Sequence, residues 1–398
     1  MDATLRYVSL FSGCGGLDWG FEAAGFRCVE AFEKDKSSCD TFEENFTAKM
    51  RRCDISDRCI DDFVTLSDAD LLLAGPPCQG FSTVGKNDPN DARNSLLTLT
   101  AKIAARHKPR MVIIENVPGL LSARNADNFN SVISILKGAD YEVSHQLFDL
   151  HDFGVPQTRK RVIIVGRHLG PKVDLSLKSL PRQSLRNALE GLPQKHLHSV
   201  RKLSEKSDEH RIASKILPGQ KLSNVRSGDN AVHTWEIPAV FGAVTDEEAS
   251  LLETMVRLRR QNRQRDFGDA DPVPFSALEK IFGARALPLV KSLLEKDYLR
   301  KIGEHFDLSR TFNGKFRRLE WDKAAPTVHT RFGQARFFLH PDEHRGFTYI
   351  EAARLQTFPD KFRFSGTASQ NFTMIGNAVP PKFAEHLAGH IRDNWSAL

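Results

Sequence analysis

Cys78 is the side chain in this sequence whose surroundings most favour covalent chemistry. It lies in the run Gly75-Pro76-Pro77-Cys78-Gln79-Gly80-Phe81-Ser82, directly after an apolar segment, Asp70–Ala74, that is typical of a buried strand. The two prolines fix φ and remove two backbone donors, so the chain must turn and present the thiol at the carboxyl end of the strand. Ligands bind at that edge in open α/β sheets. Cys78 is therefore a candidate nucleophile, and the alternative at this point is a small buried apolar residue.

A carboxylic acid and two arginines stand at further strand boundaries. Glu115 ends the apolar segment Met111–Ile114, so we expect it at the same sheet edge as Cys78. It could act there as a general acid toward a ring nitrogen, or it could form a structural ion pair with an arginine. Arg159 and Arg161 alternate at the start of another strand and so share one face. One of them could pair with Glu115 while the other reaches a substrate.

A glycine-rich turn indicates a nucleoside site. The segment Phe11–Leu17, with glycines at 13, 15 and 16, lies between a strand and a helix, where the backbone can approach a ligand closely. Glu33 ends the second strand and could accept hydrogen bonds from ribose hydroxyls. Asp54 follows a third short strand and could serve an adenine amino group. The glycine spacing is not the dinucleotide fingerprint, and ordinary turn glycines with surface acids remain the alternative.

The elements that must position these residues alternate regularly over the first 168 residues. Continuous apolar strands separated by helices predict a doubly wound α/β domain with a mostly parallel sheet covered on both faces. The strands are expected at Tyr7–Phe11, Cys28–Phe32, Asp70–Ala74, Met111–Ile114 and Arg161–Gly166, and the helices at Leu17–Ala24, Ser37–Phe46, Ser95–Arg106 and Asn128–Lys137. Near the other end of the chain, helices are expected at Tyr349–Phe358 and Pro381–Asp393, the last of them returning to pack on this domain.

Composition excludes several classes of protein. No apolar run approaches the length of a membrane span and no secretory pattern opens the chain, so we expect a cytoplasmic protein without a membrane partner. All six cysteines fall within the first 78 residues, without a C-x-x-C pair or histidines at ligand spacing. No metal site is expected.

The middle of the chain has a different character. Between Lys178 and Arg318 there are 26 Lys and Arg against 18 Asp and Glu, although the net charge of the whole chain is only +6. This asymmetry suits a polyanionic partner, and a chance excess on a solvated surface is the alternative. A helix at Asp246–Arg260, two short helices at Ser276–Ile281 and Ala286–Lys296 and a hairpin at Tyr298–Leu308 follow one another. That order predicts a winged helix over about 241–312.

Five arginines within nine residues close the first of these helices, at Arg257, Arg259, Arg260, Arg263 and Arg265. They could lie along phosphates or reach guanine edges. They could equally form a solvated helix face.

Several motifs in order resemble those of the DNA (cytosine-5)-methyltransferases. They are Gly75–Ser82, Glu115-Asn116-Val117, Gln157-x-Arg159-x-Arg161 and Gly376-Asn377-Ala378-Val379, preceded by Phe11–Leu17, which is similar to the family's S-adenosylmethionine motif. Arg354-Leu355-Gln356-x-Phe358-Pro359 is similar to the stretch before its closing motif. The compact length resembles the bacterial restriction–modification type. The resemblance implies a Rossmann-like S-adenosylmethionine-dependent methyltransferase fold over 1–170 and 319–398, with a smaller target-recognition domain over 171–318.

The resemblance also implies a reaction. Cys78 would add to C6 of a cytosine flipped out of duplex DNA, and C5 would then take the methyl group of S-adenosylmethionine, leaving S-adenosylhomocysteine. Glu115 would bind or protonate N3, Arg161 would hold O2 and Arg159 would orient Glu115. The implied cofactor residues are Phe11, Gly13, Cys14, Gly15, Gly16, Leu17, Glu33, Lys34, Asp54, Ile55, Pro77, Asn377 and Val379. The implied DNA contacts are Ser82, Arg93, Gln157, Thr327 and the arginines at 257, 259, 260 and 263, with Thr327 bracing the recognition part.

One position departs from the family pattern. The residue after the ribose carboxylate is often a large apolar side chain that lies against adenine, and here it is Lys34. Its aliphatic stem can still cover the ring, but stacking should be weaker.

Two other functions compete with this one. A tRNA cytosine-5 methyltransferase shares the catalytic motifs but usually carries a Cys-Phe-Thr signature, and this chain has no cysteine after Cys78. A catalytically inert DNA-binding relic would not need Cys78, Glu115 and both arginines together. We therefore expect a DNA (cytosine-5-)-methyltransferase that acts as a monomer in the bacterial nucleoid, with a cognate restriction endonuclease as a candidate partner.

Overall fold

The protein divides into two compact units. The computed structural model describes residues 4–58, 60–77, 94–192, 200–225, 228–261, 263–264 and 270–395. Unit 1 comprises residues 1–192, 322–331 and 349–398, and unit 2 comprises residues 193–321 and 332–348. Three residues predicted from the sequence to act on DNA, Cys78, Ser82 and Arg93, lie outside the described residues, as does Arg265. Within the described part of the chain, no helix combines the length and the apolar character needed to cross a membrane.

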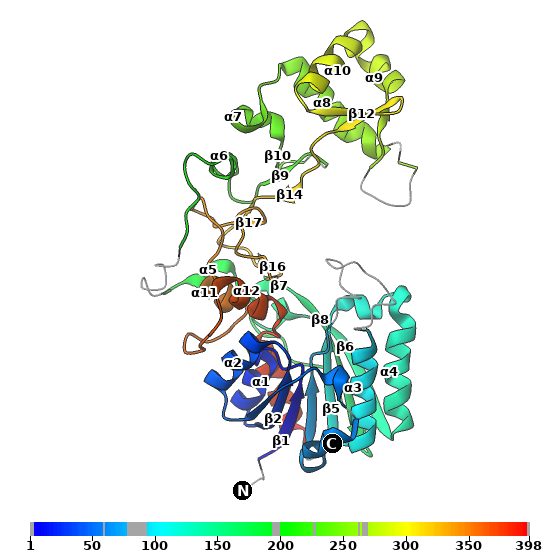
Figure 1. Ribbon diagram of the computed structural model, residues 1–398, viewed down its shortest axis with the longest axis vertical. Helices are drawn as coiled ribbons and strands as arrows, with labels where there is room; N and C mark the ends of the chain where they lie inside the picture. The colour runs from blue at the N-terminus through cyan, green and yellow to red at the C-terminus, as the bar shows by residue number, and fades with distance from the viewer. Residues whose placement is uncertain are drawn as a thin grey trace. The chain divides into compact units, whose positions relative to one another are not determined.

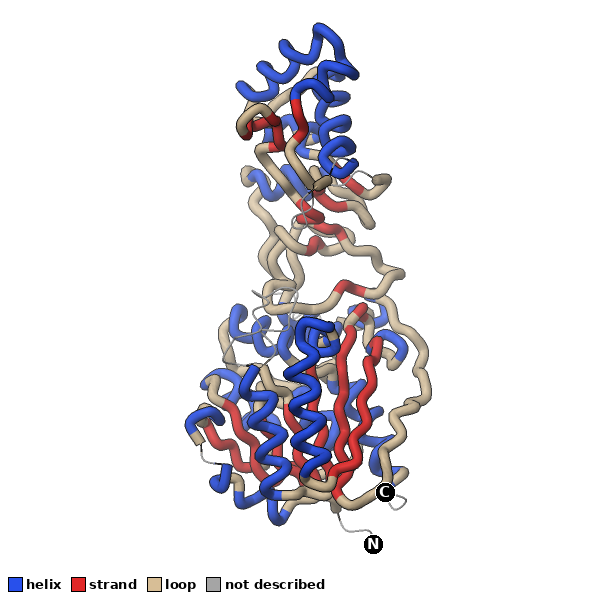
Figure 2. Tube along the Cα trace, turned by 90° about the vertical axis from the view of Figure 1, so that its right-hand side faces the viewer, coloured by secondary structure: helices blue, strands red, loops and turns tan. Residues whose placement is uncertain are grey.

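A seven-stranded sheet forms the centre of unit 1 (Figures 1 and 2). Its order is β3-β2-β1-β4-β5-β8-β6, and the first five strands are parallel. The strands are β1 (Arg6–Leu10), β2 (Arg27–Glu33), β3 (Lys49–Arg52), β4 (Leu71–Ala74), β5 (Met111–Asn116), β6 (Tyr141–Asp149) and β8 (Lys160–His168). All residues of β4 and β5 are buried, which explains their unbroken apolar sequences.

Helices cover both faces of this sheet, as predicted for a doubly wound domain (Figure 2). They are α1 (Gly16–Ala23), α2 (Lys36–Asn45), α3 (Asn94–His107), α4 (Ala126–Gly138) and α13 (Pro381–Asp393). The predicted return of the last helix is confirmed, because α13 packs along α1. Their contact is close: a Cβ on Gly20 would stand 2.4 Å from the Cβ of Ala384.

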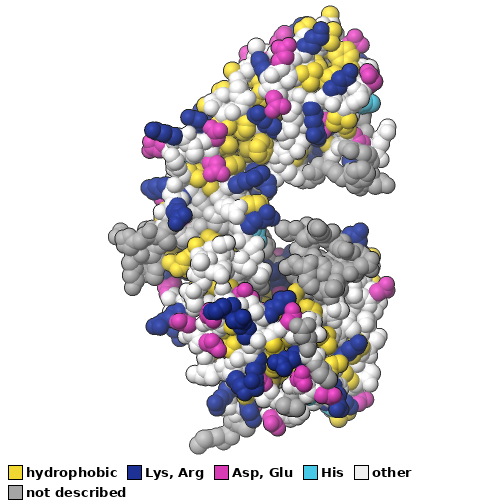
Figure 3. All heavy atoms as spheres, in the orientation of Figure 1, with side chains coloured by type: hydrophobic (Ala, Val, Ile, Leu, Met, Phe, Trp, Pro, Cys, Tyr) yellow, Lys and Arg dark blue, Asp and Glu magenta, His cyan; other side chains and the backbone are white. Residues whose placement is uncertain are grey.

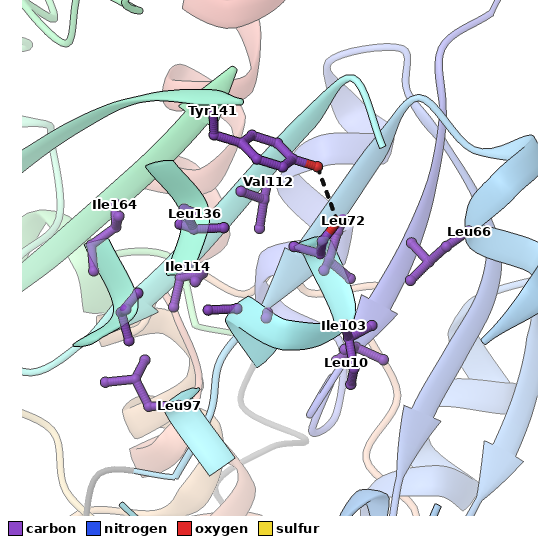
Figure 4. Close-up of a cluster of buried hydrophobic side chains, with 14 of the residues drawn as sticks. Leu10, Leu66, Leu72, Leu97, Ile103, Val112, Ile114, Leu136, Tyr141 and Ile164 are labelled. Atoms are coloured by element: carbon purple, nitrogen blue, oxygen red, sulfur yellow. Dashed lines mark hydrogen bonds between the residues drawn. The ribbon is translucent and has the colours of Figure 1, made fainter. Parts of the chain in front are cut away.

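The main core of unit 1 lies between the sheet and α3 and α4 (Figure 4). Alternate residues of the central strands supply its sheet side, for example Leu72, Val112 and Ile114. Leu97 and Leu136 come from the two helices. Tyr141 is the polar member of this cluster, and its hydroxyl donates to the carbonyl oxygens of Ala104 and Pro109.

The structure corrects two features of the predicted sheet. The strand that contains Arg161, β8, runs antiparallel to β5 and β6. The edge strand β6 was not predicted, because its exposed positions Glu142, His145 and Gln146 break the continuous apolar pattern that identified the other strands. Antiparallel pairing brings the start of β8, rather than its end, to the carboxyl edge of β5.

Both predicted domain boundaries also move. Residues 171–192 belong to unit 1 rather than to the middle segment, because they are bonded along its surface. Leu180 donates to the Asp152 carbonyl, and the Val173 carbonyl accepts from Ser144. Residues 332–348 belong to unit 2 although they follow position 318. The chain therefore enters unit 2 twice.

The remaining short elements of unit 1 connect its motifs. They are β7 (Gln157–Thr158) paired with β16 (Ala325–Pro326), and the helices α5 (Leu185–Leu189), α11 (Tyr349–Leu355) and α12 (Ala368–Asn377).

Unit 2 contains two packed layers of short elements, each with its own hydrophobic cluster. One comprises α6 (Asp208–Lys215), α7 (Pro238–Phe241), β9 (Lys221–Ser223), β10 (Ala231–Val232), β14 (Asn313–Lys315), β15 (Arg317–Arg318) and β17 (Phe338–Leu339). The other comprises α8 (Asp246–Gln261), β11 (Val273–Pro274), α9 (Phe275–Phe282), α10 (Ala286–Glu295), β12 (Leu299–Ile302) and β13 (His305–Leu308).

The three helices and the hairpin predicted for the second of these layers are confirmed. Their core includes Leu251, Met255, Leu278, Val290 and Leu293. A third strand, β11, was not predicted and completes an antiparallel sheet of order β11-β13-β12.

Candidate active site

The carboxyl ends of β1, β2, β4 and β5 meet at one edge of the sheet, because these strands are parallel neighbours. A Cβ placed on Gly75, after β4, would lie 3.6 Å from the carbonyl oxygen of Phe11 and 3.9 Å from Oε2 of Glu115. The segment that leads to Cys78 therefore passes between the glycine loop and Glu115. Asn116 fixes this turn, since its Nδ2 donates to the carbonyl of Pro76 at 3.3 Å. Pro77, which precedes Cys78 in the sequence, is the last described residue of this segment.

Glu115 forms a close ion pair with Arg161. The Arg161 Nε and the Glu115 Oε1 are 2.6 Å apart, and each side chain is only 12% exposed. The antiparallel direction of β8 explains the contact, because its first residues stand opposite the last residues of β5. The prediction that Arg159 orients Glu115 is corrected here: the arginine that pairs with Glu115 is Arg161.

Arg159 instead binds backbone carbonyl groups of separate segments of the chain. It is 1% exposed, and its guanidinium donates to the carbonyl oxygens of Val328, Gly376 and Ala378 at 2.9–3.1 Å. A buried guanidinium satisfied by carbonyl groups fixes the path of the segments that it bridges. Arg159 thus joins the strand region to the closing motif, which lies more than 200 residues further along the chain.

Gln157 is also structural, which corrects its prediction as a DNA contact. It is fully buried; its Nε2 donates to the Leu355 carbonyl and to Oε1 of Gln356, and its Oε1 accepts from Val328. Gln356 in turn donates to the Ala378 carbonyl. Sequence analysis quoted Gln356 only as part of a motif and assigned it no role. The available signal in the sequence was that glutamine and arginine occur together in two motifs, Gln157-x-Arg159 and Arg354-Leu355-Gln356.

The glycine loop has the conformation that its composition predicts. Gly13 and Gly15 have φ of 56° and 90°, and Phe11 shares the left-handed region at 54°. A Cβ on Gly15 would stand 2.3 Å from the Phe46 ring, so only glycine fits there. A Cβ on Gly16 would stand 2.5 Å from the Val379 carbonyl oxygen. The loop and the closing motif are therefore in contact.

Glu33 is fixed as a hydrogen-bond acceptor beside this loop. Its Oε2 accepts from the Gly13 N–H at 3.0 Å, and its Oε1 accepts from the N–H groups of Lys34 and Asp35 at 2.8 and 2.9 Å. A carboxylate that is held by three backbone donors and only half-buried keeps acceptor capacity for ribose hydroxyls. Space for a ligand exists at this place, because a Cβ on Gly13 would meet no described atom within 4 Å.

Asp54 and Lys34 form an ion pair at the predicted adenine end of the site. The Lys34 Nζ lies 3.1 Å from Asp54 Oδ2, while Asp54 Oδ1 accepts from the backbone and hydroxyl of Ser56. The Ser56 hydrogen bonds, aided by Lys34, hold the pKa of Asp54 below its usual value. Ile55, directly after it, is buried.

The other predicted cofactor residues fall into two groups. Cys14 and Leu17 are buried beneath the loop, and burial raises the pKa of the Cys14 thiol to about 12, so it stays protonated. Val379 is buried at the loop and Asn377 is exposed at the end of α12. Phe358, whose ring would touch a Cβ on Gly16, belongs to a motif that sequence analysis noted without assigning it to this site.

The arginines of the middle segment that were predicted to contact DNA differ in their exposure to solvent. Arg257, Arg260 and Arg263 are exposed, whereas Arg259 is buried and its Nε lies 2.5 Å from Asp307. Its burial and this ion pair correct the prediction that Arg259 contacts DNA. Thr327 donates its hydroxyl to the Thr158 carbonyl, a contact within unit 1.

Comparison with known proteins identifies the family. A family model described as C-5 cytosine-specific DNA methylase matches residues 5–393. Type II methyltransferase M.HgiBI of Herpetosiphon aurantiacus is 30% identical, with 94% of each chain covered. Type II methyltransferase M.NlaIV of Neisseria lactamica is also 30% identical, with 94% of this chain and 96% of its own covered.

Solved structures share the fold. A prophage-encoded protein of E. coli has a TM-score of 0.61 at 23% identity, with 99% of this chain and 100% of that chain covered. Methyltransferase EhMeth of Entamoeba histolytica has a TM-score of 0.56 at 15% identity, with 99% of each chain covered. The family model and the two type II relatives show that the chain belongs to the C-5 cytosine-specific DNA methylases and is a DNA (cytosine-5)-methyltransferase.

Proposed function

We propose that this enzyme methylates C5 of a cytosine that is flipped out of a specific duplex DNA sequence, through a covalent bond between Cys78 and C6. The observation that carries the proposal is the Glu115–Arg161 pair, in which Glu115 Oε2 lies 3.9 Å from a Cβ placed on Gly75, three residues before Cys78. An acid and a cation beside a nucleophile are what a pyrimidine addition requires.

S-adenosylmethionine supplies the methyl group as an electrophilic sulfonium. The residues that would hold it are the glycine loop, Glu33 at the ribose, Asp54 with Ile55 at the adenine, and the closing motif at Val379. The contact between Gly16 and Val379 and the three donors to Glu33 support this assignment.

Cys78 would add as a thiolate to C6, which makes C5 electron-rich. Glu115 would donate a hydrogen bond or proton to N3 and so stabilise the charge that the addition creates. After C5 is methylated, its proton leaves to a base or to water, the C6–S bond breaks and the thiolate is regenerated.

Arg161 would contact both Glu115 and the cytosine. Its Nε is paired with Glu115 and its Nη1 donates to the Lys160 carbonyl at 2.8 Å. Among the described contacts, Nη2 remains for the cytosine O2. Arg159 would act as a positioning residue through the carbonyl groups that it binds.

Trapping the adduct tests the proposal. Duplex DNA in which 5-fluorocytosine replaces cytosine has no removable C5 proton, so the enzyme and S-adenosylmethionine should form a complex that survives denaturing electrophoresis. Cys78→Ser should abolish this complex, while Cys28→Ser, which alters a buried thiol that belongs to no predicted site, serves as the control. The proposal is refuted if the Cys78→Ser enzyme still forms the adduct, or if the unaltered enzyme forms none with any cytosine-bearing duplex.

The relatives' names suggest a biological setting. Both relatives named above are type II methyltransferases, and we infer that this enzyme protects DNA against a cognate endonuclease. Plasmid from cells that express the enzyme should show, by bisulfite sequencing, methylated cytosines with common flanking bases. Methylation without any common flanking bases would contradict sequence-specific action.

A further inference from the structure

Helix α8 presents two chemically different faces. Leu251, Leu252, Met255 and Val256 are buried in the core of the α8–α10 layer. Ser250, Glu253, Arg257 and Gln261 are all exposed, and their spacing of three or four residues aligns them along one side of the helix. Arg260 is exposed beside this row.

The charged members of this row are not engaged by neighbouring side chains. Two other exposed arginines of the α8–α10 layer are paired: Arg285 lies 2.7 Å from Glu247 and Arg300 lies 2.9 Å from Asp307. By contrast, no side-chain hydrogen bond or ion pair among the described residues involves Glu253, Arg257 or Arg260. Their hydrogen-bonding capacity is therefore free for a partner.

A cleft of about 670 Å³ runs along this face. His233 lines it together with Ser250, Glu253, Thr254, Val256, Arg257, Arg260 and Gln261. The His233 ring is fixed in place, since Nδ1 bonds to the Ser223 carbonyl at 2.6 Å and the ring stacks on Trp235 at 4.3 Å. The concave surface is thus polar and partly preorganised.

We propose that this face of α8 reads base edges in the major groove of the target duplex, with Glu253, Arg257 and Gln261 as the reading residues and Arg260 on a phosphate. The proposal rests on the proposed function. An α-helix fits the major groove, and these three side-chain types match cytosine N4, guanine O6 and N7, and adenine N6 and N7 respectively. The arginines supply the charge complementarity to DNA.

The competing element is α10, which follows α9 and would be the reading helix in a standard helix-turn-helix arrangement. Its outward positions include Leu287, which is 50% exposed, and Pro288, with Lys291 one turn further on. Leucine and proline side chains carry no hydrogen-bonding groups, so this face offers little to a base edge. Figure 3 also shows Lys and Arg interspersed with Asp and Glu over the visible face of this layer, rather than one basic surface. Recognition of DNA must therefore depend on individual side chains rather than on the overall charge of this surface.

Position-specific methylation rates test the proposal. Purified enzyme would be given a library of duplexes in which each base of the target site, established for the unaltered enzyme, is changed singly. Arg257→Ala should reduce discrimination roughly 10- to 100-fold at one or two base pairs and leave the other positions selective. Arg257→Lys, which keeps the charge without the bidentate fork, should lose discrimination at the same positions.

Matched variants separate the alternatives. Arg285→Ala removes an exposed, paired arginine of the same layer, and Lys291→Ala and Leu287→Ala alter α10; all three should keep the selectivity profile. Unchanged profiles for both Arg257 variants, or a position-specific change in the α10 variants, would overturn the proposal. The melting temperature of each variant shows whether it folds. If Arg257→Ala does not fold, the selectivity profile of Arg257→Lys alone tests the proposal. Failure of the unaltered enzyme to methylate any duplex would instead overturn the proposed function.

Discussion

Replacing Lys34 by phenylalanine should strengthen the binding of S-adenosylmethionine. In the proposed cofactor site, Lys34 takes the place of an apolar side chain that would cover the adenine, and its Nζ lies 3.1 Å from one oxygen of Asp54. The other oxygen is already used by Ser56. The substitution therefore frees an acceptor for the adenine amino group and supplies an aromatic surface.

The expected size follows from the exposure of the pair. The side chains of Lys34 and Asp54 are 59% and 32% exposed, so losing their ion pair should cost no more than about 1 kcal/mol. An aromatic ring stacked on a base contributes about 1–3 kcal/mol. The net gain should be roughly 1–2 kcal/mol, a decrease in Kd of about 5- to 30-fold.

Isothermal titration calorimetry with S-adenosylmethionine measures this directly. Lys36→Phe is the matched control, since Lys36 is a neighbouring exposed lysine paired with Asp40 rather than with Asp54. Its Kd should match that of the unaltered enzyme. If Lys34→Phe binds no more tightly than the unaltered enzyme, adenine does not lie against position 34, and the assignment of Asp54 to the adenine fails with it.

Three further predictions concern stability. Arg161→Ala leaves Glu115 buried without its cation, and denaturant unfolding should show a loss of roughly 3 kcal/mol. Gly16→Ala forces a methyl group to within 2.5 Å of the Val379 carbonyl, and should cost about 1–3 kcal/mol while weakening cofactor binding in the same titration. Burial raises the pKa of Asp18 from 3.8 to about 7, so the unfolded chain binds fewer protons than the folded one between these values and stability falls as the pH rises. Asp18→Asn should remove this dependence, and its stability relative to the unaltered enzyme should increase from pH 5 to pH 7 in parallel denaturant titrations.

Two of these predictions have a matched control in the chain. Gly138→Ala places a Cβ where no described atom lies within 4 Å, and it should leave stability and cofactor binding intact. Asp393→Asn alters an exposed carboxylate whose substitution should leave the pH dependence unchanged. Equal losses for Gly16→Ala and Gly138→Ala would contradict the proposed contact with Val379. A pH profile shared by Asp18→Asn and the unaltered enzyme would contradict the assignment to Asp18.

Local sequence patterns were sufficient to predict many of the helices and strands. They did not show which side chains contact one another. Strands such as β4 and β5 could be predicted because every residue is buried, and α13 because its helical pattern follows two prolines. The edge strand β6 was not predicted because the exposed polar residues Glu142, His145 and Gln146 interrupt its apolar sequence. The direction of β8 was also hidden, since strand direction depends on connections rather than on residue types. As a consequence, the arginine that pairs with Glu115 was assigned incorrectly.

The sequence also did not reveal which polar side chains are buried. Gln157 and Arg259 have the residue types of DNA-contacting side chains, yet both are buried, with Gln157 bonded to a residue 199 positions away and Arg259 to Asp307. Such contacts depend on tertiary neighbours that sequence spacing does not reveal. The sequence analysis treated Arg257 and Arg259 alike, and only the structure showed that Arg259 is buried while Glu253 and Arg257 line the cleft.

The contact between Gly16 and Val379 has a consequence for the order of events during synthesis. The glycine loop leaves the ribosome early, but the residues that enclose it are made about 360 positions later. At roughly 5–20 residues per second, the loop waits for tens of seconds before its partner exists. Until α13 has docked on α1, the surface of α1 that meets Ala384 stays open to water. The glycine loop therefore reaches its described packing only after nearly the whole chain has been made.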